Sequence, residues 1–182
     1  MIWTPNDWSF CSSLVPQAAL LGVILDTTFT AGTNQVQELE AGARALGRKI
    51  EIVMIATGAD IDGAVARLRA MNVAALSIAT GPLGYSRRAQ LIAAVERHAI
   101  PTIYEAREAV LDGGLMSYGT SVPAAYRQIG VYTGRVLKGE KPGDLPFLRP
   151  SKFEMVVNLK TAKTLGLSIP TSLLLRADEV IE

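Results

Sequence analysis

The chain of 182 residues has an almost balanced charge, with 18 Lys and Arg residues against 17 Asp and Glu residues. Its hydrophobic fraction of 49% is that of a folded domain and argues against a disordered chain. Basic residues are scattered along a chain of net charge +1, which lacks the electrostatic footprint of a nucleic-acid-binding protein. We therefore expect no nucleic acid partner.

Cysteine and histidine each occur once, as Cys11 and His98. One thiol cannot form an internal disulfide, and one Cys with one His cannot build a structural zinc site. We therefore expect no bound metal and no cofactor held by such residues.

The N-terminal part of the sequence predicts no membrane segment, because Pro16 and Gln17 interrupt the short apolar stretch 14–25. The residues before it lack the basic segment that begins a secretory signal. As written, the sequence predicts a chain that stays in the cytoplasm, or one whose true start is missing.

From Leu20 onward, short apolar runs alternate with segments of helical periodicity, as in βαβ units on a parallel sheet. Helices are expected to start near Asn34, Asp60 and Ser86, and a short one spans 161–165. The predicted fold is therefore an α/β domain with a flavodoxin-like or Rossmann-like parallel sheet flanked by helices. Its strands are expected at 20–25, 50–55, 74–78, 101–104, 115–118 and 153–157.

The segment 124–137 predicts a long helix that follows a Ser-x-Pro start and ends at Gly139. Gly130 and Gly134 leave its backbone bare, which favours close packing against a partner. The following stretch 141–150 contains three prolines and predicts a linker. One face of this helix is expected to be buried, through Tyr126, Ile129, Thr133, Val136 and Leu137.

Motifs for nucleotide binding and catalysis are missing from the sequence. The glycines in 58–63 and 81–84 have neither the dinucleotide-binding nor the P-loop spacing. No serine lies in a GxSxG elbow, and His98 is accounted for by the C-terminal end of a helix dipole. We predict no catalytic residue.

Ligands of open parallel sheets collect outside the carboxyl ends of the strands, where loops and helix N-termini converge. This rule predicts the place of a binding site but not its ligand. For the polar cluster 104–108 alone, a solvated loop and a site both remain open. The candidate ligand-binding residues are Asp26, Thr27, Thr28, Gly81, Tyr85, Tyr104, Glu105 and Tyr118.

Several stretches of the chain are similar to one bacterial family. They are AIPTIYE at 99–105, GGLMSYG at 113–119, YTGRVLKGEKP at 132–142, KFEMVVNLKTAK at 152–163 and RADEVIE at 176–182. They resemble the ABC transporter substrate-binding protein family related to TrpX-type aromatic amino-acid binders. The likeness runs from about residue 14 to 182, and its C-terminal half is highly specific.

The resemblance implies a type I periplasmic-binding fold, in which two lobes close around a small ligand and the loaded protein docks on a membrane permease. Residues 14–120 would form most of the second lobe, 121–150 a helix and linker of the first lobe, and 151–182 the return to the second. Relatives carry a signal and a complete first lobe ahead of the matching segment. The chain is thus expected to lack both, and the family to be periplasmic.

The resemblance implies the solute-binding component of an ABC uptake transporter, with a small ligand such as an amino acid. Two stretches depart from the family pattern: 26–30 replaces Asn-Pro-x-Asn-Pro, and Leu83-Gly84-Tyr85 replaces an aromatic pair. The alternative is an α/β sensor or enzyme with Glu105 or Asp26 as acid or base. The first lobe that would normally pack on the helix 124–137 is expected to be missing. Because the apolar face of this helix would then be exposed, we also expect a homodimer.

Overall fold

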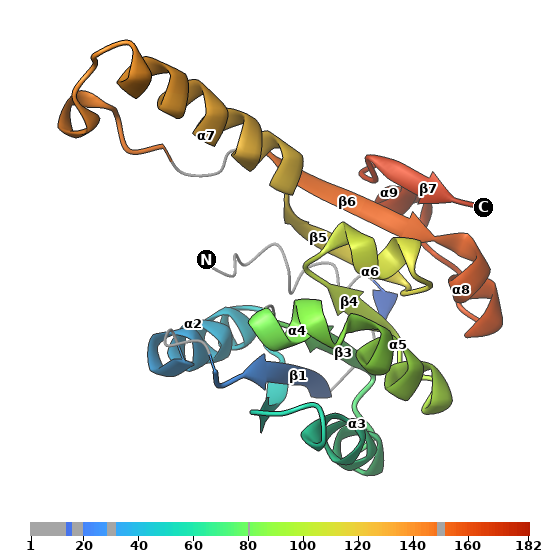
Figure 1. Cartoon of the computed structure of the whole chain (residues 1–182). Helices are drawn as coiled ribbons and strands as arrows, with labels where there is room; N and C mark the ends of the chain where they lie inside the picture. The colour runs from blue at the N-terminus through green and yellow to red at the C-terminus, as the bar shows by residue number, and fades with distance from the viewer. Residues whose placement is uncertain (1–13, 16–19, 29–31, 80, 149–151) are drawn as a thin grey trace.

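The computed structural model describes residues 14–15, 20–28, 32–79, 81–148 and 152–182 (Figure 1). Its centre is a seven-stranded sheet in the order β2-β1-β3-β4-β5-β6-β7. All neighbouring strands pair in parallel except β5 and β6, which are antiparallel. The strands are β1 (Leu20–Asp26), β2 (Lys49–Ile55), β3 (Ala75–Ile78), β4 (Thr102–Tyr104), β5 (Met116–Thr120), β6 (Phe153–Asn158) and β7 (Glu179–Ile181).

Helices follow most of the strands, as the sequence predicts for βαβ units. The structure adds short helices at 82–86, 107–111 and 171–174 that the periodicity did not indicate, because a helix of one turn leaves no repeat. The helices are α2 (Gly32–Ala45), α3 (Asp60–Ala70), α4 (Pro82–Ser86), α5 (Arg88–Arg97), α6 (Arg107–Leu111), α7 (Val122–Leu137), α8 (Leu159–Thr164) and α9 (Thr171–Leu174), with a 3-10 turn η1 at Pro142–Asp144.

Two apolar layers cover the two faces of the sheet. One layer joins the strands to α2, α8 and α9, through side chains such as Leu39 and Leu173. The other joins them to α3, α5 and α6, where the predicted inward residues Ile61, Val65 and Leu68 are all buried. The predicted α/β fold with a flanked, mostly parallel sheet is therefore confirmed.

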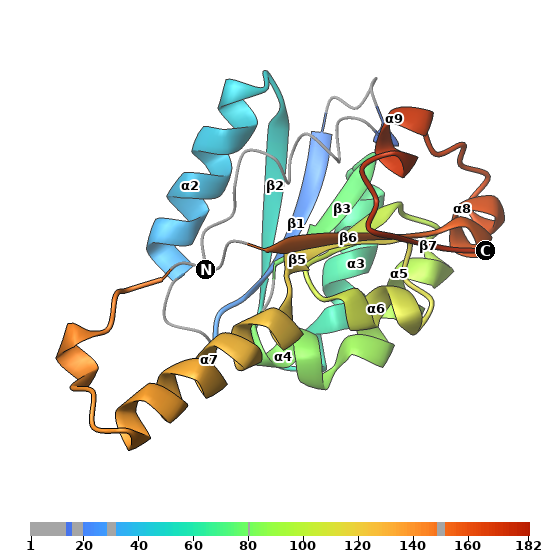
Figure 2. The ribbon, with the colours of Figure 1, turned by 90° about the horizontal axis from the view of Figure 1, so that it is seen from above.

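The antiparallel strand β6 follows from the path of the chain through α7. The chain leaves the sheet at the carboxyl end of β5, runs out along α7, and returns to the same edge at Lys152 (Figures 1 and 2). The backbone N–H of Ser121 donates to the carbonyl of Lys152 at 3.0 Å, which ties the two crossing points together. A strand that starts at this edge can only run back beside β5 in the opposite direction.

The apolar face of α7 is not buried, contrary to the sequence-based expectation. Tyr126 is 70% exposed and Leu137 is 82% exposed, and α7 contains no buried residue. The helix extends away from the sheet in both ribbon views (Figures 1 and 2). Sequence periodicity identified the apolar stripe correctly, but it cannot tell which surface, if any, covers it.

Candidate functional site

The carboxyl ends of four parallel strands meet at one edge of the sheet. Register pairs Asp26 with Ile55 across β1 and β2, and Ile78 with Tyr104 across β3 and β4. The residues that follow these strands, including Glu105, therefore gather at one edge, as expected. Thr80, which follows β3 in the sequence, lies outside the described residues.

Asp26 is a buried carboxylate with only 5% of its surface exposed. One carboxylate oxygen accepts hydrogen bonds from the Thr28 backbone N–H at 2.8 Å and the Thr28 hydroxyl at 2.6 Å. The other accepts from the backbone N–H of Leu83 in α4 at 2.8 Å. Burial alone would raise the pKa of Asp26, but these hydrogen bonds together hold it below its ordinary value. Asp26 thus joins the loop after β1 to the start of α4.

Gly81 lies directly against this carboxylate. A Cβ atom at residue 81 would stand 2.7 Å from the Cβ and Cγ atoms of Asp26, closer than real side chains approach. Only glycine therefore permits α4 to start this close to β1. The sequence-predicted residues Asp26, Thr28 and Gly81 form one connected unit.

Thr27 extends the pairing of β1 with β2. Its backbone N–H and its hydroxyl both donate to the carbonyl of Ile55, at 3.0 and 3.2 Å. Thr27 and Thr28 are exposed beyond this contact. They form part of the open surface at the edge.

Tyr85 stands on α4 at the same edge and is 43% exposed. Partial burial is the largest cause that raises its pKa, and the negative charges of Glu105 and Glu108 raise it further. The phenol therefore lies within electrostatic range of the loop after β4. Tyr85 and Glu105 are brought together from elements 20 residues apart in sequence.

Glu105 lines a shallow hollow between the end of β4, the end of β5 and the start of α7. The hollow is also lined by Arg107, Gly119, Val122 and Glu154. It lies where the chain leaves the sheet for α7. This hollow places one sequence-predicted residue, Glu105, beside the base of the projecting helix.

Tyr118 lies on β5 but packs largely within the protein. Its ring stacks on Phe153 of β6, with centroids 5.6 Å apart and planes at 17°. The ring also packs against the apolar layer of α2 and α9. Tyr118 is therefore partly buried and supports the edge from beneath.

Tyr104 differs from the other candidates because its ring packs in the core, although it also borders Glu105 and Gly84. It pairs with Ser117, yet its ring lies against Gly114, three residues back toward the amino end of the sheet. A Cβ atom at residue 114 would meet the ring at 2.8 Å, so glycine makes room for it. Tyr104 is only 5% exposed and belongs to the core beside α5.

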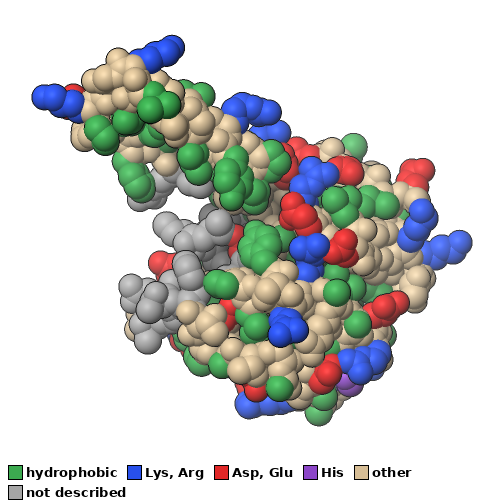
Figure 3. All heavy atoms as spheres, viewed as in Figure 1, with side chains coloured by type: hydrophobic (Ala, Val, Ile, Leu, Met, Phe, Trp, Pro, Cys, Tyr) green, Lys and Arg blue, Asp and Glu red, His purple; other side chains and the backbone are tan. Residues whose placement is uncertain are grey.

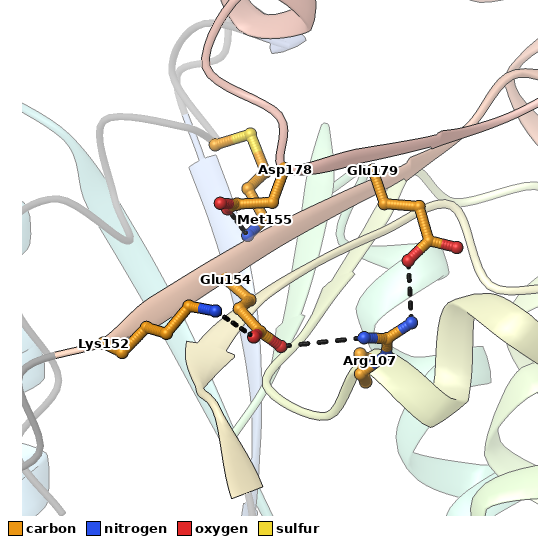
Figure 4. A network of polar contacts seen from close by, with 6 residues as sticks. All are labelled: Arg107, Lys152, Glu154, Met155, Asp178 and Glu179. Atoms are coloured by element: carbon orange, nitrogen blue, oxygen red, sulfur yellow. Dashed lines mark hydrogen bonds and ion pairs between the residues drawn. The ribbon is translucent and has the colours of Figure 1, made fainter. Parts of the chain in front are cut away.

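A charged network braces the return of the chain into β6 (Figure 4). Glu154 contacts Lys152 at 3.2 Å and Arg107 at 3.7 Å, and Arg107 contacts Glu179 of β7 at 2.7 Å. The hydrogen bond from the Ser121 side chain, followed by the nearby cations, lowers the pKa of Glu154 against the effect of burial. Asp178 accepts from the backbone N–H of Met155 at 2.8 Å.

Sequence reasoning did not identify this network. Arg107 was recognised only as part of a polar cluster after a strand, and Glu154 lies 47 residues away in a strand with no special signal. Only the antiparallel pairing of β5 with β6 brings them together. No local pattern in the sequence reports that pairing.

The described part of the chain supports neither a metal site nor a membrane-spanning helix. No group of three or more His, Cys, Asp or Glu residues in those ranges is arranged to hold a metal ion. Among the same residues, no helix combines the length and the apolar character that crossing a membrane requires.

Residues 7–181 match the model of the protein family described as ABC transporter substrate binding protein. The chain belongs to this family. Its members are non-catalytic substrate-binding proteins. The family resemblance found in the sequence is therefore confirmed.

Individual relatives agree with this assignment. The chain is 25% identical over 155 residues to a tyrosine-binding protein of Clostridioides difficile, covering 85% of this chain and 45% of that protein. An ABC domain from Streptococcus pneumoniae solved in complex with L-Trp superposes with a TM-score of 0.85 at 26% identity, covering 95% of this chain and 60% of that one. A conserved domain protein from Vibrio cholerae shares the fold, with a TM-score of 0.84 at 22% identity, over 97% of this chain and 59% of that one.

The coverage shows how much of the family architecture is present. The chain spans 45% of the length of the tyrosine-binding relative and 60% of the Streptococcus structure. Both alignments nevertheless cover most of this chain. The chain therefore spans about half the length of these relatives.

Proposed function

We propose that this chain forms the ligand-binding part of a substrate-binding component of an ABC uptake transporter, and that it holds a small molecule such as an amino acid. The observation that carries the proposal is the family match over 7–181. The tyrosine-binding and L-Trp-bound relatives support an amino acid or a related compound as the ligand. A membrane permease is the corresponding protein partner, at the extracytoplasmic location typical of the family.

The ligand site is proposed at the carboxyl-end edge of the sheet. Tyr85 offers a half-exposed aromatic face, and Glu105 offers a carboxylate for an ammonium group. The positive end of the α7 dipole begins at the same edge and would favour a ligand carboxylate. Thr27 and Thr28 would complete the contact surface, and Gly81, which is buried against Asp26, would set how closely α4 approaches it.

The remaining candidate residues are assigned supporting roles. Asp26 has both oxygens engaged by Thr28 and Leu83, so we assign it to positioning rather than ligand contact. Tyr118 and Tyr104 are packed within the protein and hold the sheet beneath the edge.

We propose that the chain forms most of one lobe and contributes a helix and a linker to a second. Residues 14–120 and 151–182 would form one ligand-binding lobe, because they share one sheet. Residues 121–150 would belong to an opposing lobe, since α7 has no buried residue and leaves the sheet at the ligand edge. A chain that supplies both walls of the cleft is expected to bind more tightly, because more of the ligand is then buried.

Self-association is proposed as the way in which this chain covers α7. Hydrophobic side chains gather along the projecting helix (Figure 3). They include Tyr126, Ile129 and Leu137, and the bare faces of Gly130 and Gly134 meet no atom within 4 Å. A two-fold homodimer would bury both copies of this stripe at once.

A thermal-shift screen tests the transport assignment. The chain is heated with each proteinogenic L-amino acid and with small carboxylates, all at millimolar concentration. We expect one group of related amino acids to raise the melting temperature, because ligands that bind only the folded state stabilise it. If none of these compounds shifts the transition, an amino-acid ligand is wrong.

A further inference from the structure

A second pocket lies at the opposite edge of the sheet, near the amino ends of β4 and β5. Its walls come from α5, β4, the start of β5 and α8. Its enclosed volume is about 60 Å³, which leaves room for a ligand of only a few heavy atoms, because a single water needs about 10–15 Å³ by the same measure. Ile92, Val95 and Leu165 make its surface largely apolar.

The hydroxyl of Tyr104 reaches this pocket. The ring runs from β4 past Gly114, and both residues line the pocket. Tyr104 is 5% exposed, and its hydroxyl forms no hydrogen bond with any residue in the ranges that the structure describes. The hydroxyl oxygen is not fully buried, so it stays accessible to a molecule in the pocket.

Glu96 supplies a negative charge at the mouth of the same pocket. Its carboxylate is exposed on α5 and forms no ion pair within the described part of the chain, whereas its neighbour Arg97 pairs with Asp62. Burial first, and then the charge of Glu96, raises the pKa of Tyr104. The carboxylate therefore lies within electrostatic range of the buried phenol.

Besides Thr164, whose hydroxyl donates to the carbonyl of Lys160 at 3.1 Å, two threonines of the pocket are already committed as donors. The Thr102 hydroxyl donates to the carbonyl of Ile100 at 2.9 Å, and the Thr161 hydroxyl donates to the carbonyl of Gly113 at 2.8 Å. Each hydroxyl oxygen keeps acceptor capacity toward the pocket. Together with the Glu96 carboxylate, these oxygens are hydrogen-bond acceptors beside a negative charge. The lining therefore suits a ligand that donates hydrogen bonds and carries a positive charge.

We propose that this pocket is a second small-molecule site, which binds an aliphatic primary ammonium compound. The ammonium group would be held by Glu96, the Tyr104 oxygen and the two threonine oxygens, because an ammonium has three donors and no acceptor. Its carbon chain would lie on Ile92, Val95 and Leu165. The site is separate from the carboxyl-end edge and does not depend on the function proposed for that edge.

An NMR titration of the whole chain with n-butylammonium tests the proposal. Two compounds with four carbon atoms serve as controls. n-Butanol carries no charge, and n-butyrate carries a negative charge. The methyl resonances of Ile92, Val95 and Leu165 are expected to shift with n-butylammonium, at least about threefold more weakly with n-butanol, and not with n-butyrate. Equal affinity for the amine and the alcohol would overturn the proposal, as would shifts that map elsewhere.

Two substitutions locate the contacts. Glu96→Gln and Tyr104→Phe are each expected to weaken n-butylammonium binding about threefold, the effect of a partly exposed ion pair or one neutral hydrogen bond. Glu38→Gln, at an exposed position of α2, is the control and should bind like the unmodified chain. If Glu96→Gln bound n-butylammonium as tightly as the unmodified chain, Glu96 would not be the group that binds the ammonium. This result would stand even if Tyr104→Phe were poorly folded.

Discussion

The carboxylate of Asp26, at the end of β1, accepts a 2.8 Å hydrogen bond from the backbone N–H of Leu83, 57 residues later in α4. The same side chain also holds the Thr28 turn. One buried carboxylate therefore fixes two neighbouring loops of the candidate ligand edge. Its contribution is to preorganise the site, since its oxygens have little capacity left for a ligand.

Replacing this carboxylate should destabilise the protein. Asp26→Ala removes three hydrogen bonds at a buried position and leaves the N–H of Leu83 without its partner, which we expect to cost about 2 kcal/mol at pH 7. Urea unfolding measures the loss. Asp144→Asn, in the 3-10 turn, is the control and should change the free energy of unfolding little.

The stabilisation by Asp26 should depend on pH. Its pKa in the folded protein is below the ordinary value of 3.8, so the contribution is present above about pH 4 and is lost as the pH falls through the folded pKa. The difference in stability between the unmodified chain and Asp26→Ala should therefore shrink as the pH falls below about 4. A constant difference from pH 7 to pH 3 would contradict this account.

Tyr104 should behave as a core residue. Tyr104→Ala removes a ring that is 5% exposed, and truncation of a buried aromatic residue costs about 3–5 kcal/mol. Tyr104→Phe should leave the free energy of unfolding unchanged or slightly higher, because it removes only an unpartnered hydroxyl. Calorimetric melting of both variants distinguishes these effects. A stable Tyr104→Ala variant would show that the ring is not part of the core.

The electrostatic link between Tyr85 and Glu105 gives a spectroscopic test of the edge. Burial and the charges of Glu105 and Glu108 raise the pKa of Tyr85 above 10.0. Glu105→Gln should lower that pKa, because one negative charge no longer opposes the tyrosinate. Ultraviolet titration, with Tyr85→Phe to assign the signal and Glu38→Gln as the charge control, measures it. An unchanged pKa would place the two residues too far apart to share a ligand.

The fold was predictable from the sequence where the spacing of apolar residues shows which positions of a helix or strand are buried. All six expected strands are present, and the helix expected to start near Asp60 begins at that residue. The Asp60 carboxylate accepts from the N–H groups of Ala56 and Thr57, just ahead of the helix. The three-residue strand β7 was too short to leave an alternating pattern.

The candidate site was predictable only as a place. The strand-end rule put Asp26, Gly81, Tyr85 and Glu105 at one edge, but side-chain direction decides what each can do. Tyr104 follows the same rule by position, yet the room left by Gly114 turns its ring toward the other edge. Whether a side chain leans forward or back along a strand depends on tertiary packing, which sequence position does not report.

Exposure of α7 should drive self-association at micromolar concentration. Light scattering is expected to give a mass near twice the 19.4 kDa of the chain, and Leu137→Asp should shift it toward the monomer, since burying a charge in an apolar interface is costly. Leu175→Asp is a matched control, because Leu175 is also 82% exposed but lies after α9. A concentration-independent monomer would rule out the dimer.

Mapping of amino-acid binding by NMR tests the central claim most directly. Backbone amide resonances of the 182-residue chain are followed during titration with L-tryptophan and L-tyrosine at millimolar concentration, where weak binding to one wall of a cleft is still detected. The account predicts shifts confined to Thr27, Thr28, Gly81, Tyr85 and Glu105, and their loss in Tyr85→Ala, which should melt like the unmodified chain. Shifts that map away from the carboxyl-end edge, or persist unchanged in Tyr85→Ala, would contradict it.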